Sequence, residues 1–190
     1  MISQLRAAPN QLTLLRLIFI PFVVIAVMEG HDALALILFV IAGISDAFDG
    51  LLARILKQQT ALGLYLDPIA DKLLLSTLFL ALSFLHRRIP WYVTILVFSR
   101  DIGILIVSTL LYATNTLRDL RPSIFGKLNT ASQVATIFLV LLYPVFPVPW
   151  IEAMMHAFFR ITFALTLVSW IHYTITVGRR LRTAGASHSG

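Results

Sequence analysis

The sequence predicts an all-α integral membrane protein with six transmembrane helices and a polar cavity that faces the cytoplasm. Of its 190 residues, 58% are hydrophobic and 13% are charged, and the mean hydropathy is +0.88, which leaves too little polar surface for a water-soluble domain. The apolar residues form runs close to the roughly 20 residues that a helix needs to cross a bilayer. The net charge of +6 comes from basic residues at the ends of these runs, where they suit a membrane surface rather than nucleic acid.

Short connections separate the predicted helices, which therefore form one domain. The spans are predicted at about residues 10–28, 33–57, 61–85, 91–113, 124–145 and 151–177. Helix-breaking residues lie between several of them, namely Gly30 with Asp32, Pro90, Pro122 and the prolines from 144 to 149. We expect a single membrane domain over residues 1–182 and a small, polar, disordered tail over residues 183–190. The first run has no small-residue cleavage pattern, so it is interpreted as a retained helix rather than a signal peptide.

The distribution of basic residues predicts the orientation. Arg6, Arg54, Lys57, Arg118, Arg121, Lys127, Arg179, Arg180 and Arg182 fall on one side of the predicted membrane, and chiefly Arg87 and Arg88 fall on the other. Because cytoplasmic loops carry the excess of Lys and Arg, both termini are expected in the cytoplasm. The absence of cysteine excludes a disulfide framework, a thiolate zinc site and a cysteine nucleophile.

Acidic residues interrupt two neighbouring spans at the same predicted end. At 100° per residue, Asp46 and Asp49 share a face near the end of the second span with Gly50 and Ala53. Gly63, Asp67 and Asp71 recur every fourth position at the start of the third span, so they also share one face. A short connection makes the two helices antiparallel neighbours, which brings the four carboxylates together at the cytoplasmic end.

Carboxylates this close together must take up protons or hold cations. Oxygen-only ligands favour hard divalent ions such as Mg²⁺, Mn²⁺ or Ca²⁺. Two such ions would neutralise the four charges and could clamp a diphosphate during an in-line displacement. Arg54, one turn beyond the first pair, could bind phosphate, and the small residues on the same face would let a bulky group approach the backbone.

Three other interpretations are possible. Asp67 followed by Pro68 could be only a helix cap, although this leaves Gly63 and Asp71 without a role. Asp46 and Asp49 could be solvated residues at a span end. The carboxylates could instead line the path of a cation transporter, but that function predicts acidic residues spread across the membrane depth rather than gathered at one end.

The acidic segment resembles a known family signature. The pattern Asp46-x2-Asp49-Gly50-x2-Ala53-Arg54-x8-Gly63-x3-Asp67-x3-Asp71 is similar at every defined position to that of the CDP-alcohol phosphotransferase family. The resemblance implies a membrane enzyme with six transmembrane helices, usually a homodimer, that transfers a phospholipid group from a CDP-linked donor to a hydroxyl acceptor and releases CMP. A scaffold without activity is a further alternative, against which the complete motif argues.

The resemblance also implies roles for individual residues. Asp46, Asp49, Asp67 and Asp71 would hold two Mg²⁺ or Mn²⁺ ions, and Asp71 would also be the base for the acceptor hydroxyl. The CDP-donor pocket would be formed by Asp49, Gly50, Ala53, Arg54 and Gly63.

Other segments indicate the branch of the family and thereby the acceptor. Residues 9–16 are similar to the amino-terminal stretch of both the phosphatidylglycerolphosphate synthase and the cardiolipin synthase branches. The Ser99-Arg100-Asp101 and 126–130 segments are more similar to the cardiolipin synthase branch. We therefore expect CDP-diacylglycerol as the donor and phosphatidylglycerol as the acceptor, with glycerol 3-phosphate as the alternative acceptor. The expected location is the bacterial inner membrane, with the mitochondrial inner membrane as the alternative.

Basic residues are the candidates for binding the acceptor. Arg100 lies inside an apolar span, where an unpaired charge costs at least roughly 2.5 kcal/mol, so it is expected to bind an acceptor phosphate or to form a buried ion pair. Asp101 leaves the helix about 100° away, so the two side chains need not pair. Arg118, Arg121 and Lys127 could form an acceptor patch or only anchor the membrane surface. Lys72 is expected to reach the surface or to screen the carboxylates.

Overall fold

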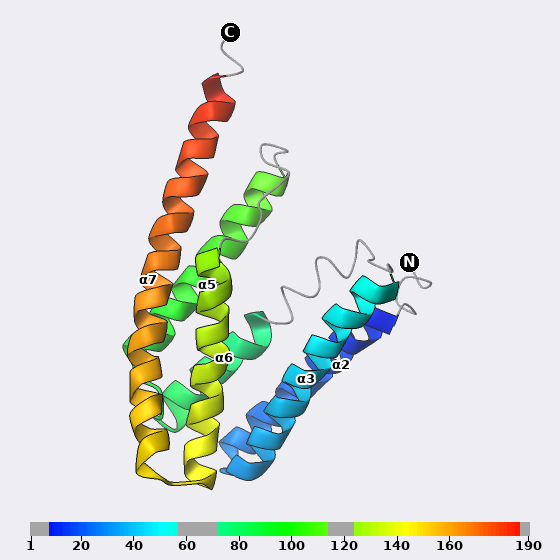
Figure 1. Cartoon of the computed structure of the whole chain (residues 1–190), viewed down its shortest axis with the longest axis vertical. Helices are drawn as coiled ribbons and strands as arrows, with labels where there is room; N and C mark the ends of the chain where they lie inside the picture. The colour runs from blue at the N-terminus through cyan, green and yellow to red at the C-terminus, as the bar shows by residue number, and fades with distance from the viewer. Residues whose placement is uncertain (1–7, 57–71, 114–123, 187–190) are drawn as a thin grey trace.

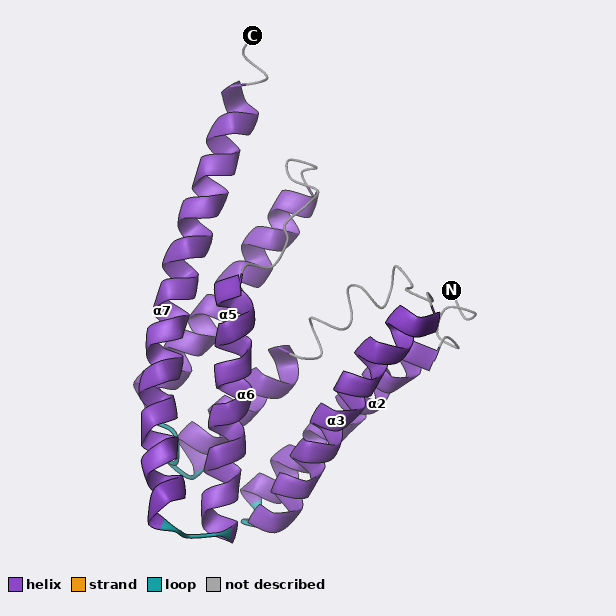
Figure 2. Ribbon diagram, viewed as in Figure 1, coloured by secondary structure: helices purple, strands orange, loops and turns teal. Residues whose placement is uncertain are grey.

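The structure is a computed structural model that describes the backbone of residues 8–56, 72–113 and 124–186, and the side chains of residues 18–45, 72–107 and 124–179. This part of the chain is helical and contains no strand (Figure 2). Its elements are α2 (Ala8–Met28), α3 (Asp32–Leu56), a helix over residues 72–80 that ends in the π-helical turn η1 (Ala81–Leu85), α5 (Trp91–Ala113), α6 (Ile124–Val145) and α7 (Pro149–Ala186). The all-α prediction is confirmed for these residues.

The helices form two antiparallel hairpins joined by the middle of the chain. α2 packs along α3, α6 packs along α7, and α3 contacts α6. α5 packs against α7, and η1 contacts both α2 and α5. Figure 1 shows that α2 begins and α7 ends toward the same end of the bundle.

Most predicted helix bounds agree with the structure, and the last helix differs. α5 and α6 have the predicted bounds, and α2 and α3 agree within two residues. α7 extends to Ala186, beyond the predicted end at residue 177, and includes the first residues of the 183–190 segment predicted to be disordered. The extension contains three arginines and no proline, and arginine is a good helix former in water.

The turn between α2 and α3 depends on one glycine. Gly30 adopts φ +74°, its N–H donates to the Val27 carbonyl at 3.1 Å, and the His31 N–H donates to the Ala26 carbonyl at 2.9 Å. This pattern is a Schellman C-cap, in which glycine accepts the left-handed conformation most easily. The cap reverses the chain, so that α3 returns along α2.

An ion pair closes the same end of the bundle. Arg88, in the loop before α5, donates to both carboxylate oxygens of Asp32 at the start of α3, and the Nη2–Oδ2 distance is 3.1 Å. Such a two-pronged pair holds the loop in one orientation. The pair lies at the far end of α3 from Asp46 and Asp49.

The apolar core lies where α2, α3, the 72–85 helix, α5, α6 and the first turns of α7 meet. Its fully buried members include Val23, Val27, Leu78, Leu82, Val93, Val97, Ile137 and Leu141. Two helical stretches, Ile124–Val145 and Pro149–Arg179, are long and apolar enough to cross a membrane, and shorter apolar stretches cover Ile18–Met28, Asp32–Ser45 and Lys72–Leu85. These lengths refer to the described residues only.

Candidate active site

The first pair of predicted carboxylates lies on a continuous helix. α3 runs unbroken from Asp32 to Leu56, so the backbone at Asp46 and Asp49 is helical. This is the backbone geometry that their predicted common face requires. Gly50, Ala53 and Arg54 lie on the following turns of α3. The side chains of these five residues and the whole of Gly63, Asp67, Asp71, Arg118 and Arg121 lie outside the described residues.

An open groove of about 800 Å³ lies between α3 and α6. Its lining consists of Phe39, Val40, Gly43 and Ile44 from α3 and Gly126, Lys127, Thr130, Ala131, Val134, Ala135 and Phe138 from α6. Within this lining only Lys127 and Thr130 have polar side chains. No heavy atom lies within 4 Å of the position that a Cβ on Gly43 would occupy, so this residue faces open space.

The groove leads toward the helical turns that carry the carboxylates. Asp46 and Gly50 follow Gly43 by three and seven positions, which places them along the same side of α3. α6 runs opposite to α3 (Figure 1), so its first turns, with Lys127 and Thr130, lie toward the end of α3 that bears Asp46 and Asp49. The groove is therefore apolar along its length and polar at the end nearer the predicted metal ligands.

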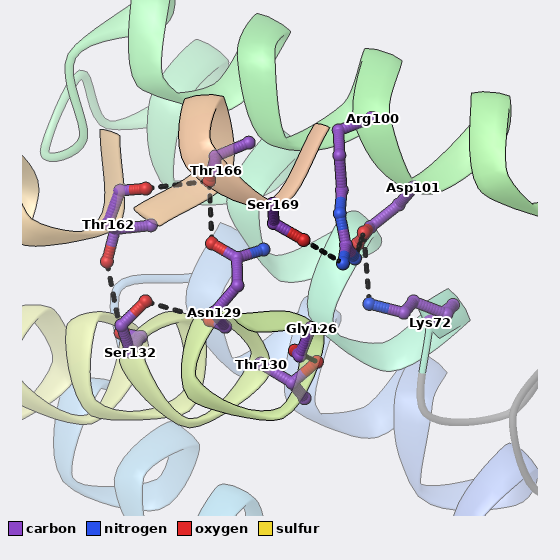
Figure 3. Close-up of polar contacts among 10 residues, drawn as sticks. All are labelled: Lys72, Arg100, Asp101, Gly126, Asn129, Thr130, Ser132, Thr162, Thr166 and Ser169. Carbon is purple, nitrogen blue, oxygen red and sulfur yellow. Dashed lines mark hydrogen bonds and ion pairs between the residues drawn. The ribbon is translucent and has the colours of Figure 1, made fainter. Parts of the chain in front are cut away.

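A buried ion cluster joins the 72–85 helix, α5 and α7 (Figure 3). Asp101 on α5 accepts two hydrogen bonds on the same oxygen, Oδ1, one from Lys72 Nζ at 3.0 Å and one from Arg100 Nη1 at 2.7 Å. Arg100 Nη2 donates to Ser169 Oγ on α7 at 2.7 Å. Arg100 and Asp101 are only 4% and 5% exposed, so these interactions are largely shielded from water.

The ion cluster corrects the expectation that Arg100 and Asp101 need not pair. Their backbone positions differ by about 100° around the helix, but the long guanidinium side chain of Arg100 bends back to reach Asp101. In a buried place, charges pair because an unpaired ion there is strongly destabilising. Both terminal nitrogens of Arg100 are engaged by protein side chains, which favours the buried ion pair over the acceptor-phosphate role.

Lys72 donates to Asp101, 29 positions later in the chain, and its side chain is 28% exposed. The side chains of the four carboxylates that it is expected to screen lie outside the described residues, so that expectation stays a prediction. Spacing along one helix contains no information about the Lys72–Asp101 contact, because it joins two different helices.

A second polar seam lies between α6 and α7. Thr166 Oγ1 donates to Asn129 Oδ1 at 2.8 Å, and Thr136 and Thr162 share a hydrogen bond of 2.8 Å. All four side chains are completely buried. The seam continues toward Ser169 and the ion cluster (Figure 3), so α6, α7 and α5 are joined by polar contacts as well as by apolar packing.

Sequence reasoning missed the residues of this seam and Ser169. The signal that could have found them is the recurrence of small hydroxyl side chains at 162, 166 and 169 within an otherwise apolar helix. Such residues often form hydrogen bonds between helices in membranes. They were overlooked because hydroxyl groups also bond to the carbonyl four residues earlier in their own helix, as Thr166 does with Thr162 at 2.7 Å.

The chemistry of the predicted donor set fits a hard divalent cation. Asp46, Asp49, Asp67 and Asp71 offer only carboxylate oxygens, which suit Mg²⁺ and Mn²⁺. Among the described side chains no other group of three or more His, Asp or Glu residues is arranged to hold a metal ion. The four aspartates therefore remain the candidate ligands.

Comparisons with known proteins identify relatives of the chain. Residues 6–177 match the family model described as CDP-alcohol phosphatidyltransferase. A probable phosphatidylglycerophosphate synthase of Mycobacterium tuberculosis is 39% identical over 140 residues, which cover 70% of this chain and 65% of that protein. The chain thus spans about two thirds of the length of this relative.

Two further relatives are named for different acceptors, one as a glycerol-3-phosphate phosphatidyltransferase and one as a cardiolipin synthase. A CDP-diacylglycerol–glycerol-3-phosphate 3-phosphatidyltransferase of Aquifex aeolicus is 31% identical over 168 residues, which cover 88% of this chain and 93% of that protein. A human cardiolipin synthase (CMP-forming) is 33% identical over 155 residues, which cover 73% of this chain and 51% of that protein.

Proposed function

Because the chain belongs to the CDP-alcohol phosphatidyltransferase family, we propose that it transfers a phosphatidyl group from CDP-diacylglycerol to a glycerol-type hydroxyl and releases CMP. The structural observation that supports a lipid donor is the groove between α3 and α6. It offers an apolar surface for acyl chains and ends in polar residues toward Asp46 and Asp49. A donor with a charged head and apolar tails matches this gradient.

The acyl-chain part of the proposal rests on the groove lining. Phe39, Val134 and Phe138 present apolar surface along the groove. Burying a methylene group contributes about 0.8 kcal/mol, so a few carbons of one chain in the groove would hold the donor in register. The diphosphate would then lie near the turns of α3 that follow Gly43.

The four predicted aspartates would hold two Mg²⁺ or Mn²⁺ ions, which when bound would neutralise the diphosphate and stabilise the leaving group. Arg54 would bind a donor phosphate. Gly50, Ala53 and Gly63 would leave room for the nucleotide to approach the backbone.

In the proposed reaction, the acceptor oxygen forms a bond to the phosphatidyl phosphorus while the phosphoanhydride bond to CMP breaks. CMP leaves with the electron pair of that bond. Asp71 takes the proton of the acceptor hydroxyl as general base. This direct displacement requires no covalent enzyme intermediate.

Phosphatidylglycerol is the first candidate acceptor, which would make cardiolipin the product. The similarity of the Ser99-Arg100-Asp101 and 126–130 segments to cardiolipin synthases favours it. Glycerol 3-phosphate is the second candidate, because the Aquifex relative named for that acceptor is matched over 93% of its length. Lys127, at the polar end of the groove, is the described candidate for contact with either acceptor.

The proposed setting is a membrane with all six helical segments crossing it and the active site on the cytoplasmic side. Large apolar side chains are exposed on each of the five labelled α-helices, as with Phe22, Ile37, Ile106, Phe138 and Ile171. Exposed apolar surface of this extent suits contact with lipid. A bacterial inner membrane is the proposed location, with the mitochondrial inner membrane as the alternative, and a homodimer is the proposed assembly.

One assay tests both the reaction and the acceptor. Purified protein in mixed micelles with labelled CDP-diacylglycerol and Mg²⁺ receives phosphatidylglycerol, glycerol 3-phosphate or both. We expect CMP release that depends on an acceptor, with labelled cardiolipin as the main product when both are present. Labelled phosphatidylglycerophosphate as the main product would select the second acceptor. No acceptor-dependent CMP release would refute the proposed function.

A further inference from the structure

Three buried polar atoms, where the polar seam meets the ion cluster, make no hydrogen bond to the described part of the chain. They are Asn129 Nδ2 on α6 and Arg100 Nε and Asp101 Oδ2 on α5. Asn129 is completely buried, and Arg100 and Asp101 are 4% and 5% exposed. Because unpaired polar atoms are strongly unfavourable away from bulk water, such groups are normally satisfied by protein or by an ordered water.

Helix α7 sets the distance between the seam and the cluster. Thr166 Oγ1 donates to Asn129 Oδ1 at 2.8 Å, and Arg100 Nη2 donates to Ser169 Oγ at 2.7 Å. Thr166 and Ser169 are three positions apart on α7, so they share one face with Cβ atoms about 5–6 Å apart. Asn129 and Arg100 are therefore bonded to neighbouring turns on the same face of α7.

This spacing matches the span of a single water molecule. Two hydrogen bonds of about 2.8 Å placed end to end cover about 5.6 Å. Figure 3 shows the amide nitrogen of Asn129 on the side nearer Ser169, whereas the amide oxygen is bonded to Thr166. If the amide is rotated by half a turn, the oxygen takes the place of the nitrogen, so a polar atom of Asn129 faces Ser169 in either assignment.

We propose that one ordered water molecule bridges Asn129 and the ion cluster at the junction of α5, α6 and α7. The water accepts a hydrogen bond from Asn129 Nδ2 and donates to the cluster oxygens, Ser169 Oγ and Asp101 Oδ2. Three polar partners are the usual number for a buried water. Water suits the site better than a larger ligand, because Asn129, Ser169 and Asp101 are at most 5% exposed. Binding of this water is independent of the proposed function.

The bridge joins the ion cluster and the polar seam into one hydrogen-bonded chain. Lys72, with a 28% exposed side chain, begins the chain near the surface. Thr166 donates to the Thr162 carbonyl at 2.7 Å, and Thr162 shares a hydrogen bond with Thr136 inside the bundle. With the water in place, the 72–85 helix, α5, α6 and α7 are connected by polar contacts without a gap.

A high-resolution crystal structure of the unsubstituted protein tests the bridge directly. We expect one peak of density within about 2.7–3.2 Å of Asn129 Nδ2 and of Ser169 Oγ or Asp101 Oδ2. A direct hydrogen bond between Asn129 and Ser169 would overturn the proposal. Density larger than one water, or no density between the two side chains, would overturn it as well.

A double-mutant cycle tests the bridge through stability. Asn129→Leu and Ser169→Ala each remove one partner of the water, although the two side chains bond to Thr166 and Arg100 rather than to each other. Once one change has released the water, the second change loses less. In mixed SDS micelles, the unfolding equilibrium constant of the double variant should therefore be smaller than the product of the single effects by about fivefold or more. Effects that multiply would refute the bridge.

Thr136→Val combined with Ser169→Ala is the matched control. Thr136 is also completely buried in the seam, but it bonds to Thr162, one turn beyond Thr166 from Ser169. These two effects should multiply to within about twofold, and equal coupling in this pair would indicate general loosening between α6 and α7 and overturn the proposal. If Asn129→Leu does not fold, Asn129→Ala replaces it with the same expected coupling. Neither measurement uses substrate or metal, so both remain decisive if the protein has no transferase activity.

Discussion

A larger side chain at position 43 should weaken binding of the lipid donor without destabilising the fold. No heavy atom lies within 4 Å of a Cβ added there, and Gly43 lines the groove, so an added side chain starts in open space. Glycine inside a helix is less favourable than alanine by about 1 kcal/mol. Gly43→Ala and Gly43→Leu should therefore leave the folded protein as stable as the unsubstituted chain or slightly more stable.

The loss of donor binding follows from the volume that leucine occupies. Its four side-chain carbons take the space of about four acyl methylene groups, each contributing about 0.8 kcal/mol when buried. The sum of about 3.2 kcal/mol corresponds to roughly a two-hundredfold weaker interaction. Gly43→Ala adds one carbon and should weaken donor binding by no more than about fourfold on the same scale.

The assay measures CMP release against CDP-diacylglycerol concentration in mixed micelles, together with the thermal unfolding temperature. Gly43→Leu should raise KM for a long-chain donor far more than for a short-chain donor that does not fill the groove. An unchanged KM for Gly43→Leu would refute the acyl-chain role of the groove. An increase independent of chain length would place the head group rather than the chain beside Gly43, and would also refute it.

Four further predictions test the site, the packing and the orientation. Chelation should abolish CMP release and Mg²⁺ or Mn²⁺ should restore it, whereas full activity after thorough chelation would exclude the two-metal proposal. Asp71→Asn should reduce turnover by at least about a hundredfold with little change in the affinity for CDP-diacylglycerol. Asp46→Asn should instead weaken binding of the donor. If both variants lose donor affinity equally, Asp71 is not the general base. Gly103→Ala should destabilise the fold by about 1–3 kcal/mol, because its Cβ would lie 2.2 Å from an indole carbon on α7, and an unchanged unfolding temperature would contradict this close packing. Cysteines introduced at Gln58 and His31 should react with reagents from the cytoplasmic and the opposite side respectively, and the reverse pattern would overturn the orientation.

Helix positions were largely predictable because their signals are local. The prolines, the glycine turn at Gly30 and the lengths of the apolar runs act on neighbouring residues, and α5 and α6 begin and end where these signals indicate. The end of α7 was not predictable from hydropathy, because Arg179 and the following residues leave the apolar run without breaking the helix. Hydropathy marks where a membrane segment ends, and backbone propensity decides where the helix ends.

Candidate ligands were also found from local spacing, whereas their surroundings were not. The three-residue interval between Asp46 and Asp49 indicates a common helical face before any tertiary contact is known. Lys72 and Asp101 are 29 residues apart, and Arg100 and Ser169 are 69 apart. No periodicity connects such positions, because only the packing of the helices brings the members of the ion cluster together.

The sequence by itself determined the helical class, most helix bounds, the family and the acidic signature, because each depends on residues close together in the chain or on a motif with defined gaps. Tertiary structure alone decided that Gly43 lines a groove between α3 and α6 and that Arg100 pairs with Asp101. It also decided that Lys72 reaches α5. The physical reason is that a buried charge takes whichever partner the packed helices bring within hydrogen-bond distance, and the identity of that partner depends on contacts between elements far apart in the chain.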